Sequence, residues 1–165
     1  MDINSVPSGS RLLVDANIII YYFAGASPGC KTFFTRIANR ELGAFVTTTI
    51  VAEVLHRRMV GEAIARGLIS SGQPLKKLKA NPKVIIQLKD YITEVEKLLR
   101  LPIPVQEVVL ADIAASHALR GAYGLFVNDS INLACAQRIG ITDIATLDAD
   151  FSRVPSITVW EPSDI

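Results

Sequence analysis

The chain has 165 residues, of which 50% are hydrophobic and 20% are charged, and its formal net charge is +1. This composition excludes a disordered chain and a fibrous repeat protein, and the absence of a signal-peptide pattern and of a membrane-length apolar run predicts a cytoplasmic protein with no membrane partner. The two cysteines, Cys30 and Cys135, belong to no CxxC or Cys/His cluster, which argues against a disulfide framework and a zinc site.

Short apolar runs alternate with helical periodicity along the whole chain. In chain order they predict a strand at residues 12–14, helices at 18–23 and 31–40, a strand at 44–48, a helix after it, an amphipathic helix from about 82 to 100, a strand at 101–105, helices at 107–122 and 130–139, and strands at 144–146 and 157–160. Gly43 is expected to stop the helix before it, and the threonines 47–49 offer an N-cap. Short strands that alternate with helices predict one α/β domain over residues 1–165, with a parallel sheet covered on both faces.

Charge is distributed unevenly along the sequence. Residues 1–100 carry 14 bases and 8 acids, whereas residues 101–165 carry 3 bases and 8 acids. The segment 73–100 is the most basic part, and its apolar residues recur at helical spacing between Pro82 and Pro102. It therefore predicts an amphipathic helix with a basic outer face, and the segregation of charge points to a polar partner or ligand.

Four acids stand at or shortly after the ends of predicted apolar runs. They are Asp15, Glu53, Asp129 and Asp148. Because the carboxyl ends of parallel strands meet at one edge of a sheet, we expect these side chains to gather there. Four partly desolvated carboxylates repel one another unless a cation neutralises them. The expected cation is Mg²⁺ or Mn²⁺, which prefers oxygen ligands and promotes hydrolysis of phosphodiesters.

Two of these acids, and Asp150 two residues after Asp148, also have a purely structural interpretation. Asp129 could be only the N-cap of the helix at 130–139, and Asp150 could be only a turn residue. Glu53 lies one helical turn before Arg57 and could only form an i,i+4 pair with it. Asp15 is the most informative acid, because a carboxylate at the end of an apolar strand costs a few kcal/mol to desolvate unless another group compensates it.

Four segments, in this order, resemble the motifs of the PIN-domain ribonucleases, in the group that includes VapC-type toxins. The segments are LLVDANIII at residues 12–20, TTTIVAEV at 47–54, VNDSINLA at 127–134 and ATLDADF at 145–151. The resemblance runs from about Arg11 to Trp160. It implies a three-layer α/β/α sandwich with a central parallel sheet and an endoribonuclease that uses Mg²⁺ or Mn²⁺.

The resemblance also implies roles for individual residues. Matched motif by motif, the catalytic and metal-binding acids are Asp15, Glu53, Asp129 and Asp148, and the residues that support them are Asp150, Thr146 and Asn17. As a toxin, the protein would have an antitoxin partner that places a basic side chain among the acids. Arg57, Arg58, Lys76, Lys77 and Lys79 are expected to hold the RNA backbone, since phosphate contacts supply affinity without sequence information.

The apolar side chains of the helices between Lys31 and Leu68 exceed what one sheet face is expected to cover, which predicts a homodimer. They include Phe33, Phe34, Ile37, Ile50, Val54, Leu55 and Met59. Two other functions stay open at this point. One is a non-catalytic scaffold that binds RNA or protein, and the other is an aspartyl-phosphate phosphohydrolase that uses Asp148 and Asp150.

Overall fold

The structure is a computed structural model that describes residues 1–165, and it is built around a five-stranded sheet. The strands are β1 (Arg11–Val14), β2 (Gly43–Thr47), β3 (Val105–Gln106), β4 (Asp143–Ala145) and β5 (Thr158–Trp160). All neighbouring strands pair in parallel, in the order β3-β2-β1-β4-β5. β1 therefore lies at the centre, and the chain proceeds outward from it in both directions.

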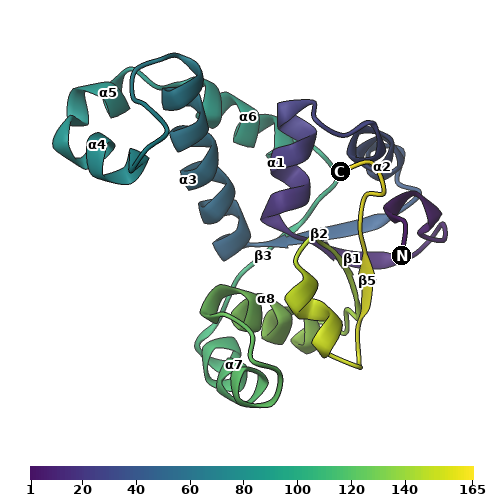
Figure 1. Cartoon of the computed structure of the whole chain (residues 1–165). Coiled ribbons are helices and arrows are strands. Elements are labelled where there is room, and N and C mark those ends of the chain that lie inside the picture. Colours follow the sequence, from purple (N-terminus) through teal and green to yellow (C-terminus); the bar gives the residue numbers. More distant parts are fainter.

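Eight α-helices and two 3₁₀ helices connect the strands. They are α1 (Ala16–Ala24), α2 (Pro28–Ala38), α3 (Thr48–Ala65), α4 (Pro74–Ala80), α5 (Pro82–Ile86), α6 (Asp90–Leu99), α7 (Leu110–Tyr123), α8 (Val127–Arg138), η1 (Ile3–Ser5) and η2 (Ala149–Arg153). Figure 1 shows α1, α2, α3 and α6 on one side of the sheet and α7 and α8 on the other. The predicted three-layer α/β/α sandwich is confirmed. None of the helices combines the length and the apolar character that crossing a membrane requires.

The main hydrophobic core fills the space between the sheet and the helices, and it contains 29 buried residues. Phe33, Phe34, Ile37, Ile50 and Val54 all belong to it and are at most 1% exposed. The homodimer prediction assumed that these side chains form a surface, and that premise is wrong. The helix α2 packs against α1 and η1, and α3 packs against α1 and β2, so these side chains face the interior, as expected for amphipathic helices.

A polar residue caps each helix that begins directly after a central strand. Asp15 follows β1 and accepts a hydrogen bond from the Ala16 N–H, so it is the N-cap of α1. Thr47 ends β2 and accepts from the Ile50 N–H, as the predicted N-cap of α3. Asp148, after β4, accepts from the Asp150 N–H and caps η2. The strand-to-helix turns thus place polar side chains at the carboxyl edge of the sheet.

The basic segment departs from its prediction, because the single helix expected from 82 to 100 is divided into α5 and α6. The break lies where Leu88 turns into a small second core with Ala63, Leu78 and Val84. The buried carboxylate of Glu62 then accepts hydrogen bonds from the N–H groups of Lys89 and Tyr91, at 3.1 and 3.0 Å. These bonds satisfy N–H groups at the start of α6, which allows a new helix to begin there.

Three further boundaries differ from the prediction. The strand expected at 101–105 is reduced to Val105–Gln106, because Pro102 and Pro104 have no N–H to give to a neighbouring strand. The helix α2 ends at Ala38, and Gly43 begins β2 instead of stopping the helix. The last helix before β4 begins at Val127, so Asp129 lies within its first turn and is not its N-cap.

Candidate active site

Asp15 is the centre of a hydrogen-bond network at the carboxyl edge of the sheet. Its Oδ1 accepts the Ala16 N–H at 2.7 Å, and its Oδ2 accepts from Asn17 Nδ2 at 2.8 Å and from Thr146 Oγ1 at 2.6 Å. Thr146 is fully buried. Three donors on one partly buried carboxylate hold it in a single orientation, and they favour its charged form.

Asn17 and Thr146 link β1 to the segment after β4. The Leu147 N–H donates to Asn17 Oδ1 at 3.2 Å, and the Asp148 N–H donates to Thr146 Oγ1 at 3.0 Å. Both residues were predicted from the sequence to support the acids, and the structure places both in contact with Asp15. The network therefore fixes the backbone that carries Asp148 relative to Asp15.

Glu53 and Asp129 reach the same edge from two different helices. Glu53 lies in the second turn of α3 and forms the i,i+4 pair with Arg57 that the sequence allowed, at 3.4 Å. Asp129 lies in the first turn of α8, where the helix dipole favours negative charge. The charges of Asp15, Asp148 and Glu53 all raise the pKa of Asp129, so the four carboxylates form one electrostatic cluster.

Asn132 is a residue whose role sequence reasoning missed. It is 3% exposed, and its Oδ1 accepts hydrogen bonds from Thr47 Oγ1 at 2.7 Å and Thr49 Oγ1 at 2.5 Å. These bonds join α8 to the start of α3, so they set the distance between the helices that carry Asp129 and Glu53. The signal that could have found it is its position one helical turn after Asp129, on the face that turns inward.

The acids raise one another's affinity for protons. Burial raises the pKa of Asp15, while the Thr146 and Ala16 hydrogen bonds oppose that rise. The pKa of Asp129 is raised from 3.8 to about 6, first by burial and then by the charges of Asp15, Asp148 and Glu53. Unneutralised negative charge is therefore the dominant electrostatic property of this edge.

The residues fit a hard divalent cation in donor type and charge, since every candidate ligand is a carboxylate oxygen. As they stand, however, no three acid, histidine or cysteine side chains converge on one point closely enough to hold an ion. A cation at this edge would have to draw the carboxylates closer together. It would relieve the repulsion that, after burial, raises the pKa of Asp129.

The structure does not bring every predicted site residue to the acids. Asp150 lies near them, since its N–H donates to Asp148 and its charge adds to the raised pKa of Asp129, but its carboxylate pairs with Arg153. Arg58 donates from Nε and Nη2 to both carboxylate oxygens of Glu94, each at 2.6 Å, so its guanidinium is already occupied. The lysines 76, 77 and 79 lie on α4, which Figure 1 shows at the far end of α3 from the sheet.

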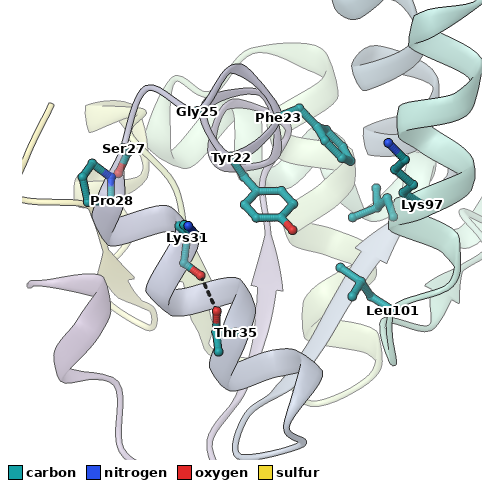
Figure 2. A pocket seen from close by; sticks show the side chains of 10 residues that line it. Tyr22, Phe23, Gly25, Ser27, Pro28, Lys31, Thr35, Lys97 and Leu101 are labelled. Carbon is teal, nitrogen blue, oxygen red and sulfur yellow. Dashed lines mark hydrogen bonds between the residues drawn. The ribbon is translucent and has the colours of Figure 1, made fainter.

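The largest cavity of the molecule lies away from the acids. It measures about 690 Å³ and is formed by the end of α1, the start of α2 and the end of α6. Figure 2 shows the Tyr22 ring in this cavity, with Lys31 and Thr35 to one side and Lys97 and Leu101 to the other. None of the molecule's five cavities is lined by any of the four acids, so the acidic edge is not a deep pocket.

Comparison with known proteins places this arrangement in a family. A sequence profile of the PIN domain matches residues 12–157, which include all four acids. The chain belongs to the PIN-domain family. A similar protein, ribonuclease VapC2 of Methanocaldococcus jannaschii, is 22% identical over 153 residues, which cover 92% of this chain and 94% of that protein.

Solved structures share the PIN-domain fold at low sequence identity. VapBC2 from Rickettsia felis, bound to a DNA fragment from its promoter, is similar with a TM-score of 0.61 and 13% identity, over 92% of this chain and 98% of that one. A toxin–antitoxin complex from Klebsiella pneumoniae has a TM-score of 0.53 and 21% identity, over 90% and 96%. VapC20 of Mycobacterium tuberculosis, a toxin that cleaves the sarcin-ricin loop, has a TM-score of 0.58 and 11% identity, over 88% and 95%.

Removal of the Asp129 charge should stabilise the cation-free PIN domain at neutral pH. Because the folded-state pKa of Asp129 is raised from 3.8 to about 6, the folded chain binds this proton more tightly, and its stability falls as pH rises through that interval. We expect Asp129→Asn to raise the free energy of unfolding at pH 7.5 by on the order of 1 kcal/mol after solvent screening, and to change it little at pH 4.

Urea unfolding in EDTA at the two pH values measures this difference. Glu161→Gln is the matched control, because Glu161 is an exposed acid outside the site. An equal increase in the free energy of unfolding at both pH values, or no increase at pH 7.5, would contradict the raised pKa of Asp129.

Proposed function

We propose that the protein is a metal-dependent endoribonuclease that hydrolyses RNA phosphodiesters. The observation that carries the proposal is that Asp15, Glu53, Asp129 and Asp148 share one edge of the sheet, where burial and the charges of the other three acids raise the pKa of Asp129. The PIN-domain match and the similarity to a ribonuclease support RNA as the substrate. Asp148 caps η2 and Asp150 pairs with Arg153, so no observation favours the phosphohydrolase alternative.

The chain's own residues would prepare the edge for a cation. Asp15, held by Asn17 and Thr146, is the most fixed of the four acids, and we assign it, Asp129, Asp148 and Glu53 as the ligands. Mg²⁺ or Mn²⁺ would supply a more acidic bound water and stabilise charge that develops on the phosphoryl group. Asp129 must lose its proton to act as a ligand, so binding should weaken below pH 6.

Asp15→Asn should abolish Mn²⁺-dependent cleavage of RNA while the fold is retained. The substitution keeps the shape of the side chain but removes the charge at the centre of the network. The measurement is cleavage of purified total RNA with Mn²⁺ and with excess EDTA, together with a melting curve of each protein. Cleavage by the variant at the wild-type rate would contradict the site, and RNA binding without any cleavage by the wild type would favour the non-catalytic scaffold.

Asp148 and Asp150 should differ in their effect on Mn²⁺ affinity. Asp150 is engaged by Arg153, whereas only one oxygen of Asp148 accepts a backbone N–H. We expect Asp148→Asn to weaken binding clearly more than Asp150→Asn, whose indirect effect should stay within about 10- to 100-fold. Calorimetric titration of both variants tests this, and a larger loss at Asp150 would mean that the two roles are reversed.

We further propose that the protein is the toxin of a toxin–antitoxin pair, supported by the solved complexes that share its fold. The cavity of Figure 2, with its apolar side chains and two lysines, is the surface we assign to the antitoxin. A small protein encoded directly upstream should co-purify with this chain and relieve its toxicity. Harmless expression of the chain alone would contradict the toxin proposal but not the proposed nuclease activity.

Light scattering of the isolated chain tests the predicted homodimer separately.

A further inference from the structure

The segment between Glu62 and Asp90 is the part of the molecule that the proposed chemistry does not use. Residues 63–89 contain six bases and no acid, namely Arg66, Lys76, Lys77, Lys79, Lys83 and Lys89. Every ion pair in the chain is made by an arginine, so none of these lysines is neutralised by an acid. The lysines at 76, 79 and 83 are exposed. Such a concentration of unpaired positive charge fits a phosphate backbone.

This basic segment is held in a defined position. Leu78, Val84 and Leu88 pack with Ala63 of α3 in a second core, separate from the main one. Arg66 reaches across to the Gln87 carbonyl at 2.8 Å, and Glu62 caps the following helix. The lysines of α4 and α5 are therefore displayed from a packed unit at the distal end of α3, as Figure 1 shows. They do not belong to a free tail.

One face of α3 connects this unit to the acids. Glu53, Arg57, Val60, Gly61 and Ile64 recur at helical spacing, so they share that face. At 1.5 Å per residue, Ile64 lies about 16 Å along the helix axis from Glu53. The face is hollowed: a depression of about 330 Å³ is lined by His56, Arg57, Val60, Gly61, Ile64 and Leu75. Leu75 belongs to the first turn of α4, so the depression ends at the basic segment.

A second hollow lies on the same helix, α4, and carries the positive charge. It measures about 510 Å³ and is lined by Gly72, Gln73, Lys76, Lys77 and Ala80, and Lys76 directly follows Leu75 of the first hollow. The first hollow thus offers apolar side chains beside an imidazole and a guanidinium, and the second offers two ammonium groups. The first hollow is suited to the bases of a nucleic-acid strand and the second to its phosphates, so one strand could contact both.

We propose that the face of α3 from Glu53 to Ile64 and the lysines of α4 and α5 form one track for single-stranded RNA, which holds the strand beyond the scissile phosphate. The proposal rests on the proposed function and specifies its substrate class. A duplex keeps its bases stacked inside, so it cannot place one in the hollow between α3 and α4, whereas an unpaired strand can. Contacts at about 16 Å from Glu53 require an RNA that extends several nucleotides from the cut.

The test is binding of fluorescein-labelled single-stranded RNA of mixed sequence, of about 5 and about 20 nucleotides, by fluorescence anisotropy. The protein carries Asp15→Asn, so that the RNA stays intact, and each variant is checked by its melting curve. We expect the longer RNA to bind at least about tenfold more tightly. The combined substitution Lys76→Gln, Lys79→Gln and Lys83→Gln should remove most of that difference and reduce the salt dependence of log K by about 2.

Gly61 offers a matched pair of variants for the path itself. A Cβ at Gly61 meets no atom within 4 Å, and the same holds for Gly121 on α7, at the other side of the sheet. Gly61→Glu places a negative charge in the depression and should weaken binding of the longer RNA about fivefold, whereas Gly121→Glu should leave it unchanged.

Equal binding of short and long RNA, an unaffected lysine variant, or equal effects at Gly61 and Gly121 would overturn the track. A 20-base-pair duplex that binds as tightly as the single strand would overturn its specificity for unpaired RNA. These outcomes are separate from the proposed activity. If the protein cleaves RNA but the substitutions do not change RNA binding, only the track is wrong. If the substitutions weaken RNA binding but the protein never cleaves RNA, only the proposed nuclease activity is wrong.

Discussion

The crowding of four carboxylates at the carboxyl edge of the sheet is the constraint on which the site depends. A parallel sheet brings its strand ends together, and here the ends of β1 and β4 carry Asp15 and Asp148. The helices α3 and α8 add Glu53 and Asp129, and burial together with the charges of the neighbouring acids raises the pKa of Asp129 to about 6. The fold tolerates this repulsion because Asp15 and Asp148 accept hydrogen bonds, Glu53 pairs with Arg57, and Asp129 is partly exposed to solvent.

The same residues serve folding and the proposed chemistry. Asp15 and Asp148 cap the helices that follow their strands, so they satisfy backbone N–H groups and remain aimed at the edge. Thr47 caps α3 and also donates to Asn132, which ties α3 to α8. An arrangement of this kind positions the charged groups through the backbone. The backbone therefore keeps Asp15 and Asp148 at this edge before any cation binds, and a cation would draw the four carboxylates together from there.

The sequence predicts the parts of this structure that depend on local pattern. The apolar run at 12–14, the threonine cap at 47 and the gathering of acids at strand ends follow from periodicity, capping preference and parallel topology. The break between α5 and α6 could not be predicted, because the carboxylate that permits it, Glu62, lies 27 and 29 residues from the N–H groups it accepts. The ion pair of Arg58, which the sequence predicts to contact RNA, could not be predicted either, because its partner Glu94 is 36 residues away. The homodimer prediction failed in its premise because apolar composition does not reveal which helical face a sheet will cover.

Anomalous diffraction at the manganese edge, from crystals grown with MnCl₂, tests the central claim most directly. The account predicts a peak at the carboxyl edge, within bonding distance of Asp15 and at least one of Asp129 and Asp148, and the loss of that peak in Asp15→Asn crystals. It also predicts that the carboxylates move toward one another relative to their present positions, in which no three converge. A well-occupied manganese site elsewhere, or none at all with the four acids unmoved, would contradict it.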